Sequence, residues 1–153
     1  TPAFGGLLSC GGWVAASLEV LPLLKEVILV GPDQEAFDQT EPTLREKVRF
    51  LSRQKLSEMT LEEKVSFFKE LTAELPTYLS VDKDVLCPKE ASTTWSQGEM
   101  TLEELCQFVK ILLEKQDILG MDVCGECDPD ACEGDHLNDL ANRKLLELWR
   151  KER

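Results

Sequence analysis

The sequence contains 153 residues, of which 42% are hydrophobic and 30% are charged. This length and hydrophobic content suffice for one buried core, so we expect a single domain over residues 1–153. The 29 acidic residues outnumber the 17 basic residues, which gives a formal net charge of −12. This charge argues against nucleic acid or an anionic membrane as a partner, and no apolar run approaches the roughly 18 residues of a membrane span.

The first half of the chain alternates between helical and extended patterns. Apolar residues at helical spacing predict a helix near residues 13–24, and Pro22 favours an early end for it. Val27–Val30 is continuously apolar, which is typical of a parallel strand covered on both faces. Acidic, proline-containing sequence through Pro42 indicates loop or short helix, and residues 48–52 predict a second strand.

Two helices in the second half begin with the same tetrapeptide, Thr-Leu-Glu-Glu, at Thr60 and at Thr101, which is the pattern of a capping box. The expected buried positions are Leu61, Val65, Phe68, Leu71 and Leu75 in the first, and Leu102, Leu105, Cys106, Val109, Leu112 and Leu113 in the second. A strand at 118–124 and a helix at about 136–149 follow, the helix with Leu137, Leu140, Ala141, Leu145, Leu148 and Trp149 facing inward. Strands that alternate with helices predict β-α-β units and a mostly parallel sheet.

The segment from Tyr78 to Pro88 is a short apolar strand that ends in Asp82 and Asp84. Because successive side chains of a strand point to opposite faces, we expect Asp82 and Asp84 to share one face and Lys83 to point away from them. Two carboxylates held this close repel each other unless a proton or a cation lies between them, and a hard divalent metal takes oxygen ligands. The alternative is that the two aspartates only solvate the turn before Pro88.

A second group of candidate ligands lies at Cys124, Cys127, Cys132 and His136. Four such ligands are what a structural zinc site needs, so a non-enzymatic binding or structural module with zinc is one hypothesis. A thioredoxin-like redox pair at Cys124 and Cys127 is another, although such a pair should open a helix. The third is that the cysteines are ordinary reduced thiols, which is our expectation for Cys124, Cys127 and Cys132.

The order of these segments resembles the ureohydrolase family, the arginases and agmatinases. The stretch Ser-Val-Asp-Lys-Asp-Val-Leu-Cys-Pro at 80–88 is similar to the family's S-x-D-x-D-x-L-D-P strand, and Trp95–Leu105 to its G-G-L-T-x-x-E helix. Residues 118–129 resemble its next strand, which ends near a glutamate, and residues 27–31 and 48–52 resemble two earlier strands. The resemblance covers roughly residues 9–130 and corresponds to the C-terminal portion of the family's domain.

The resemblance implies a three-layer arginase-like α/β fold with a mostly parallel sheet, partial because the N-terminal portion is missing. It implies a metal-dependent hydrolase of guanidino or related C–N bonds, in which Asp82 and Asp84 bind a pair of manganese ions that activate a water. Glu126 matches, with an offset of one residue, the family glutamate that pairs with the substrate's cationic group. The implied substrate is small and cationic or amide-containing.

The sequence also departs from the family pattern. Cys87 replaces the aspartate of the family's D-P, and Cys10 stands where a histidine normally supplies a proton shuttle. The family's histidine-bearing metal motifs are absent, and the one histidine is His136. We therefore expect a fragment that contains no catalytic residue and is inactive alone. We expect it to associate with its missing N-terminal portion or with another copy of itself, in the cytoplasm.

Overall fold

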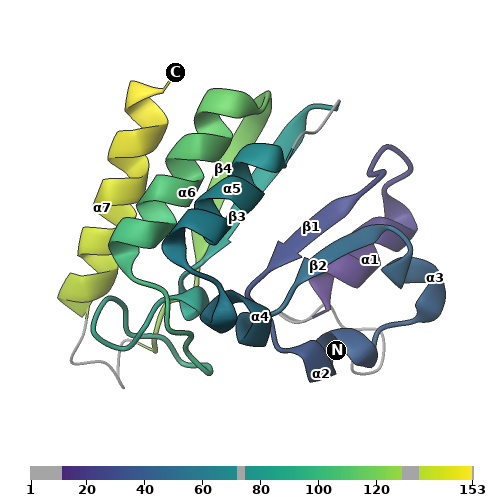
Figure 1. Cartoon of the computed structure of the whole chain (residues 1–153), viewed down its shortest axis with the longest axis horizontal. Helices are drawn as coiled ribbons and strands as arrows, with labels where there is room; N and C mark the ends of the chain where they lie inside the picture. Colours follow the sequence, from purple (N-terminus) through teal and green to yellow (C-terminus); the bar gives the residue numbers. More distant parts are fainter. Residues whose placement is uncertain (1–11, 72–74, 129–134, 153) are drawn as a thin grey trace. The chain divides into compact units, whose positions relative to one another are not determined.

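The computed structural model describes residues 12–71, 75–128 and 135–152. The chain forms two compact units, the first ending at Glu58 and the second beginning at Met59 (Figure 1). Each unit contains a two-stranded parallel sheet with helices around it. The mixed arrangement of helices and parallel strands confirms the predicted α/β class.

The first unit is built around strands β1 and β2. Its elements are α1 (Trp13–Val20), β1 (Val27–Val30), α2 (Gln34–Asp38), α3 (Pro42–Arg45), β2 (Val48–Leu51) and α4 (Arg53–Glu58). The strands are parallel and in register from Val27 opposite Val48 to Val30 opposite Leu51. An ion pair joins their C-terminal ends, because Nη2 of Arg53 donates to Oδ1 of Asp33 at 2.6 Å and to Oδ2 at 2.8 Å.

The second unit carries the aspartate motif. Its elements are α5 (Leu61–Glu70), β3 (Thr77–Asp82), the 3-10 helix η2 (Lys83–Val85), α6 (Leu102–Lys115), β4 (Ile118–Cys124) and α7 (Asp135–Lys151). Strands β3 and β4 are parallel, from Tyr78 opposite Gly120 to Asp82 opposite Cys124. Both predicted capping boxes are present, with the hydroxyl and backbone N–H of Thr60 bonded to Glu63 and those of Thr101 bonded to Glu104.

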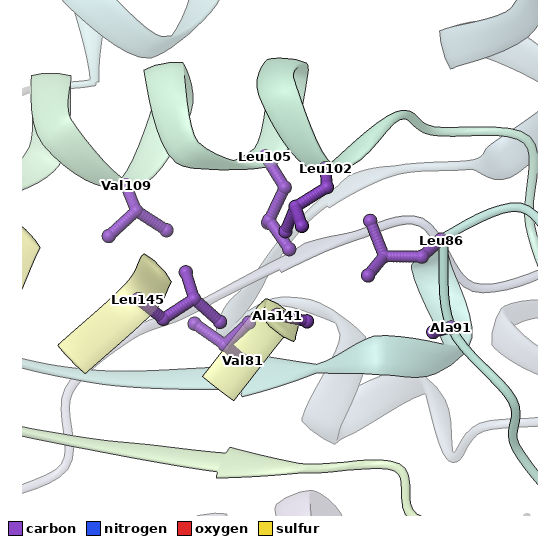
Figure 2. Close-up of a cluster of buried hydrophobic side chains, with 8 residues drawn as sticks. All are labelled: Val81, Leu86, Ala91, Leu102, Leu105, Val109, Ala141 and Leu145. Atoms are coloured by element: carbon purple, nitrogen blue, oxygen red, sulfur yellow. The ribbon is translucent and has the colours of Figure 1, made fainter. Parts of the chain in front are cut away.

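The core of the second unit lies between one face of this sheet and helices α6 and α7 (Figure 1). Figure 2 shows its buried members converging from β3, the following loop and the two helices: Val81, Leu86, Ala91, Leu102, Leu105, Val109, Ala141 and Leu145. Burying a side chain the size of Leu145, which is 0% exposed, contributes about 1.5–3 kcal/mol. The helices therefore fix the β3 backbone from one side.

Several predicted positions differ from the structure. Leu61 and Leu75 were expected in the core but are 48% and 55% exposed, because α5 ends at Glu70 and only its middle packs inward. On α6, Phe108 and Ile111 are buried, whereas the expected Cys106, Leu112 and Leu113 are half-buried. On α7, Leu140 is 44% exposed and the polar Asn138 is buried instead. Helix α4 was not predicted.

Candidate metal and substrate site

One face of the β3–β4 sheet is polar. Alternation places Val81 on the face that packs on the helices, so Tyr78, Ser80 and Asp82 lie on the opposite face, beside Asp122 of β4. The Ser80 hydroxyl donates to Oδ1 of Asp122 at 2.9 Å. A hydrogen bond to the Asp122 carboxylate, together with its negative charge, raises the pKa of Tyr78. This face therefore ends, at the C-terminal edge of the sheet, in acidic side chains.

Strand β3 ends at Asp82, so the predicted strand through Asp84 is wrong. Residues Lys83–Val85 turn into η2, and Oδ1 of Asp82 caps this turn by accepting the backbone N–H of Asp84 at 3.0 Å. Aspartate is well suited to this position because its short side chain reaches the backbone two residues on. The turn, and not strand alternation, determines how the two carboxylates are placed.

Gly125 packs directly against this turn. It adopts φ +78°, and a Cβ there would lie 2.4 Å from Oδ1 of Asp82 and 2.8 Å from the backbone N of Lys83. Only glycine combines this backbone conformation with so close an approach. Gly125 therefore brings the segment after β4, including Glu126, alongside the turn at residues 82–85, which we call the aspartate turn.

Asp84 has an unmet hydrogen-bonding group. Its Oδ1 is buried, and no donor in the described part of the chain bonds to it. Burial raises the pKa of Asp84, and the charge of Asp82 adds to this, whereas a hydrogen bond with Thr93 opposes it. A buried carboxylate oxygen without a partner is costly, so a cation bound at this point would remove a penalty.

Lys83 and Glu126 form an ion pair, with the lysine buried and the glutamate half-exposed, that sequence analysis did not identify. The Lys83 side chain is 0% exposed and points into the unit, where its ammonium pairs with Glu126 and donates to Oδ1 of Asn142 at 2.8 Å. Oε1 of Glu126 also accepts from Asn142 at 3.0 Å, and Oε2 accepts from Asn138 at 2.9 Å. Burial alone would raise the pKa of Glu126, but the hydrogen bonds from Lys83, Asn142 and Asn138 lower it.

Asn138 connects this cluster to the neighbouring loop. It is 2% exposed, its amide donates to the carbonyl of Ser92 at 2.7 Å, and its Oδ1 accepts the Ser92 N–H at 2.9 Å. Asn138 and Asn142 are four residues apart on α7 and therefore face the same way. Helix α7 thus holds the carboxylate of Glu126 in a fixed position with 54% of the side chain still exposed.

Comparison with known proteins decides the family. The model of the Arginase family matches residues 8–149, which is most of the chain. The chain belongs to the arginase family. An uncharacterized protein of Thermotoga maritima is 31% identical over 128 residues, which are 80% of this chain and 42% of that protein.

Solved structures support the arginase-like fold. A hypothetical agmatinase from Burkholderia thailandensis matches with a TM-score of 0.64 at 22% identity, and the match covers 91% of this chain and 43% of the agmatinase chain. An arginase from Bacillus caldovelox matches with a TM-score of 0.57 at 24% identity, and the match covers 80% of this chain and 42% of the arginase chain. At these identities the likeness concerns the fold. The chain spans less than half the length of these proteins, consistent with part of an arginase-like fold.

Within this arginase-family chain the cysteine hypotheses need correction. Cys127 is disulfide-bonded, so the expectation that it is reduced is wrong, and it offers no thiolate to the predicted zinc site with Cys124, Cys132 and His136. Cys124 is a free thiol, which excludes a redox pair with Cys127. Burial first, and the charges of Asp82 and Asp122 next, raise the pKa of Cys124 to about 11. Cys132 lies outside the described residues.

The remaining departure from the family pattern has a mild structural effect. Cys87 is a half-buried free thiol whose backbone N–H donates to the carbonyl of Met100 at 2.9 Å. The loop after η2 therefore keeps backbone pairing with the segment before α6 although the usual aspartate is replaced. Cys10, at the position of the family's histidine, lies outside the described residues.

Proposed function

We propose that the protein containing this chain is a metal-dependent hydrolase of guanidino or related C–N bonds. Membership in the arginase family supports the reaction class. The observation that carries the proposal is the unpartnered, buried Oδ1 of Asp84 beside Asp82, at the C-terminal end of a parallel strand. Ligand sites of open α/β sheets lie at this edge.

Asp82 and Asp84 are the residues that would hold manganese, of which the family implies two ions. Carboxylate oxygens suit this metal, and the orphaned oxygen of Asp84 fits a cation. The described residues contain no group of three or more potential ligands, so the remaining ligands would come from elsewhere in the intact protein. When bound, such ions supply a water-derived nucleophile at neutral pH.

Glu126 is the proposed substrate-contacting carboxylate. It follows β4 at the same edge, its side chain is 54% exposed, and three fixed donors orient it. Oδ1 of Asp82 caps the aspartate turn and Gly125 places Glu126 against it. The chain's own residues thus position the metal-binding carboxylates and orient the substrate.

Partners and location follow from the same proposal. We propose that this chain alone is inactive, that it functions together with the rest of the protein in the cytoplasm, and that the protein forms homo-oligomers. None of the helices in the described ranges is long and apolar enough to cross a bilayer.

The test is manganese-dependent release of urea or ammonia by the intact protein from a panel of guanidino, ureido and amide compounds. Asp82→Ala and Asp84→Ala should abolish turnover while circular dichroism stays unchanged. Asp117→Ala is the matched control, because Asp117 is exposed and precedes β4 at the opposite end of the strand. Full activity of both aspartate variants would exclude the proposal.

A further inference from the structure

The Lys83–Glu126 pair bears on the kind of substrate this site accepts. Lys83 is 0% exposed and lies between the two candidate metal ligands in sequence, so its backbone position is tied to η2. Its ammonium approaches Glu126 from the interior and is also held by Asn142. The protein itself therefore supplies a cation to the carboxylate that, by resemblance, pairs with a cationic substrate group.

We propose that Lys83 is a specificity-determining residue that selects a substrate whose group at Glu126 is neutral, such as a ureido or amide group, over a guanidinium. This inference rests on the proposed function and names its substrate class. Lys83 acts through Glu126 and is a positioning residue, not a catalytic one.

The charge balance and the hydrogen-bonding capacity of Glu126 carry the argument. One carboxylate is already neutralised by one buried ammonium, so a guanidinium brought to its exposed side would be a second cation at a single carboxylate, in a partly desolvated place. Glu126 accepts from Lys83, Asn142 and Asn138, which leaves about one of its roughly four lone-pair sites. A single N–H of a neutral ureido or amide group can use that site without adding charge.

Lys83 cannot easily withdraw to make room for a substrate cation. Its side chain has no exposed surface, and leaving Glu126 would keep a buried ammonium with Asn142 as its remaining partner among the described residues. Asn138 and Asn142 hold the carboxylate from the α7 side, so the pair is fixed by the fold before any substrate binds.

The experiment uses the intact, manganese-loaded protein and two probes that differ at one end, arginine with a guanidino group and citrulline with the ureido group. Calorimetry should show citrulline bound at least tenfold more tightly than arginine. Lys83→Met should shift this ratio at least tenfold toward arginine. Lys83→Arg, which keeps the charge, should preserve the preference, and so should Lys89→Met, which removes an exposed positive charge six residues further along the chain.

The binding ratio is read separately from turnover, so loss of hydrolysis in every assay would contradict the proposed function without changing this readout. Equal or tighter binding of arginine by the unchanged protein, or no binding of either probe, overturns the inference. If Lys83→Met does not fold, reversal of the preference in Lys83→Arg overturns it and retention supports it.

Discussion

Replacing Glu126 and replacing Lys83 should lower the free energy of unfolding by very different amounts. Glu126→Gln leaves the Lys83 ammonium buried without a counter-charge, which we expect to cost about 3 kcal/mol of unfolding free energy. Lys83→Met leaves Glu126, whose side chain is 54% exposed and still accepts from Asn138 and Asn142. Water reaches that carboxylate, so we expect a cost of about 1 kcal/mol or less.

The measurement is urea denaturation followed by tryptophan fluorescence, with the slope against urea checked for two-state behaviour. The double variant should be within about 1 kcal/mol of the unchanged protein, because no unpaired charge remains. Glu114→Gln is the control, since the exposed Lys110–Glu114 pair at 3.7 Å should contribute less than about 0.5 kcal/mol.

The pH dependence follows from the lowered pKa of Glu126. A carboxyl whose folded-state pKa is depressed contributes stability that is present above its unfolded pKa, about 4.3, and is lost as the pH falls through the folded pKa. The cost of Glu126→Gln should therefore shrink on acidification below that value.

A cost of Lys83→Met equal to or larger than that of Glu126→Gln would refute the reasoning.

Three further predictions concern the aspartate turn. Gly125→Ala should lower the free energy of unfolding by about 1–3 kcal/mol and weaken metal binding, because a φ of +78° is strained for alanine and the new Cβ meets Asp82. Gly31→Ala, at φ +105° in the first unit, tests backbone strain alone in the same denaturation assay. Asp84→Asn should raise the stability of the metal-free protein at pH 7 by up to about 1 kcal/mol, because the raised pKa of Asp84 means that its ionisation disfavours folding as pH rises. Thermal unfolding experiments that show no gain at pH 7, or a gain that persists below about pH 3.9, would contradict this. Cys124, with a pKa of about 11, should react with iodoacetamide at pH 8 roughly a hundredfold more slowly than an ordinary thiol, as measured by peptide mapping. Labelling as fast as that of an ordinary thiol would show that thiolate formation at Cys124 is not suppressed.

Local patterns predicted much of the fold. The bounds of the strand at Val27–Val30 and of the strand at Ile118–Cys124 were predicted correctly. The first is a continuous apolar run between a charged residue and a glycine, and the second is a mostly apolar segment that directly follows a helical pattern. Both capping boxes were predicted because the Thr-x-x-Glu pattern is itself the hydrogen-bonding unit. The family was predicted from the order of such segments and is confirmed.

The arrangement around Glu126 could not be predicted, because it depends on tertiary contacts. Strand alternation placed Asp82 and Asp84 on one face, but the Asp82 cap turns the chain after one residue. A lysine flanked by two aspartates gives no signal of complete burial unless its partner 43 residues away is known. Asn138 and Asn142, at i and i+4, were the available hint that one polar stripe of α7 faces inward.

Manganese stoichiometry in the intact protein tests the central claim, that Asp82 and Asp84 belong to the metal site of an arginase-family hydrolase. The protein would be loaded with manganese, desalted and analysed by mass spectrometry for bound metal, alongside Asp82→Ala, Asp84→Ala and the control Asp117→Ala. We predict loss of one or both ions in each of the first two variants, unchanged stoichiometry in the control and intact secondary structure in all three. Unchanged manganese stoichiometry in both Asp82→Ala and Asp84→Ala would contradict the account.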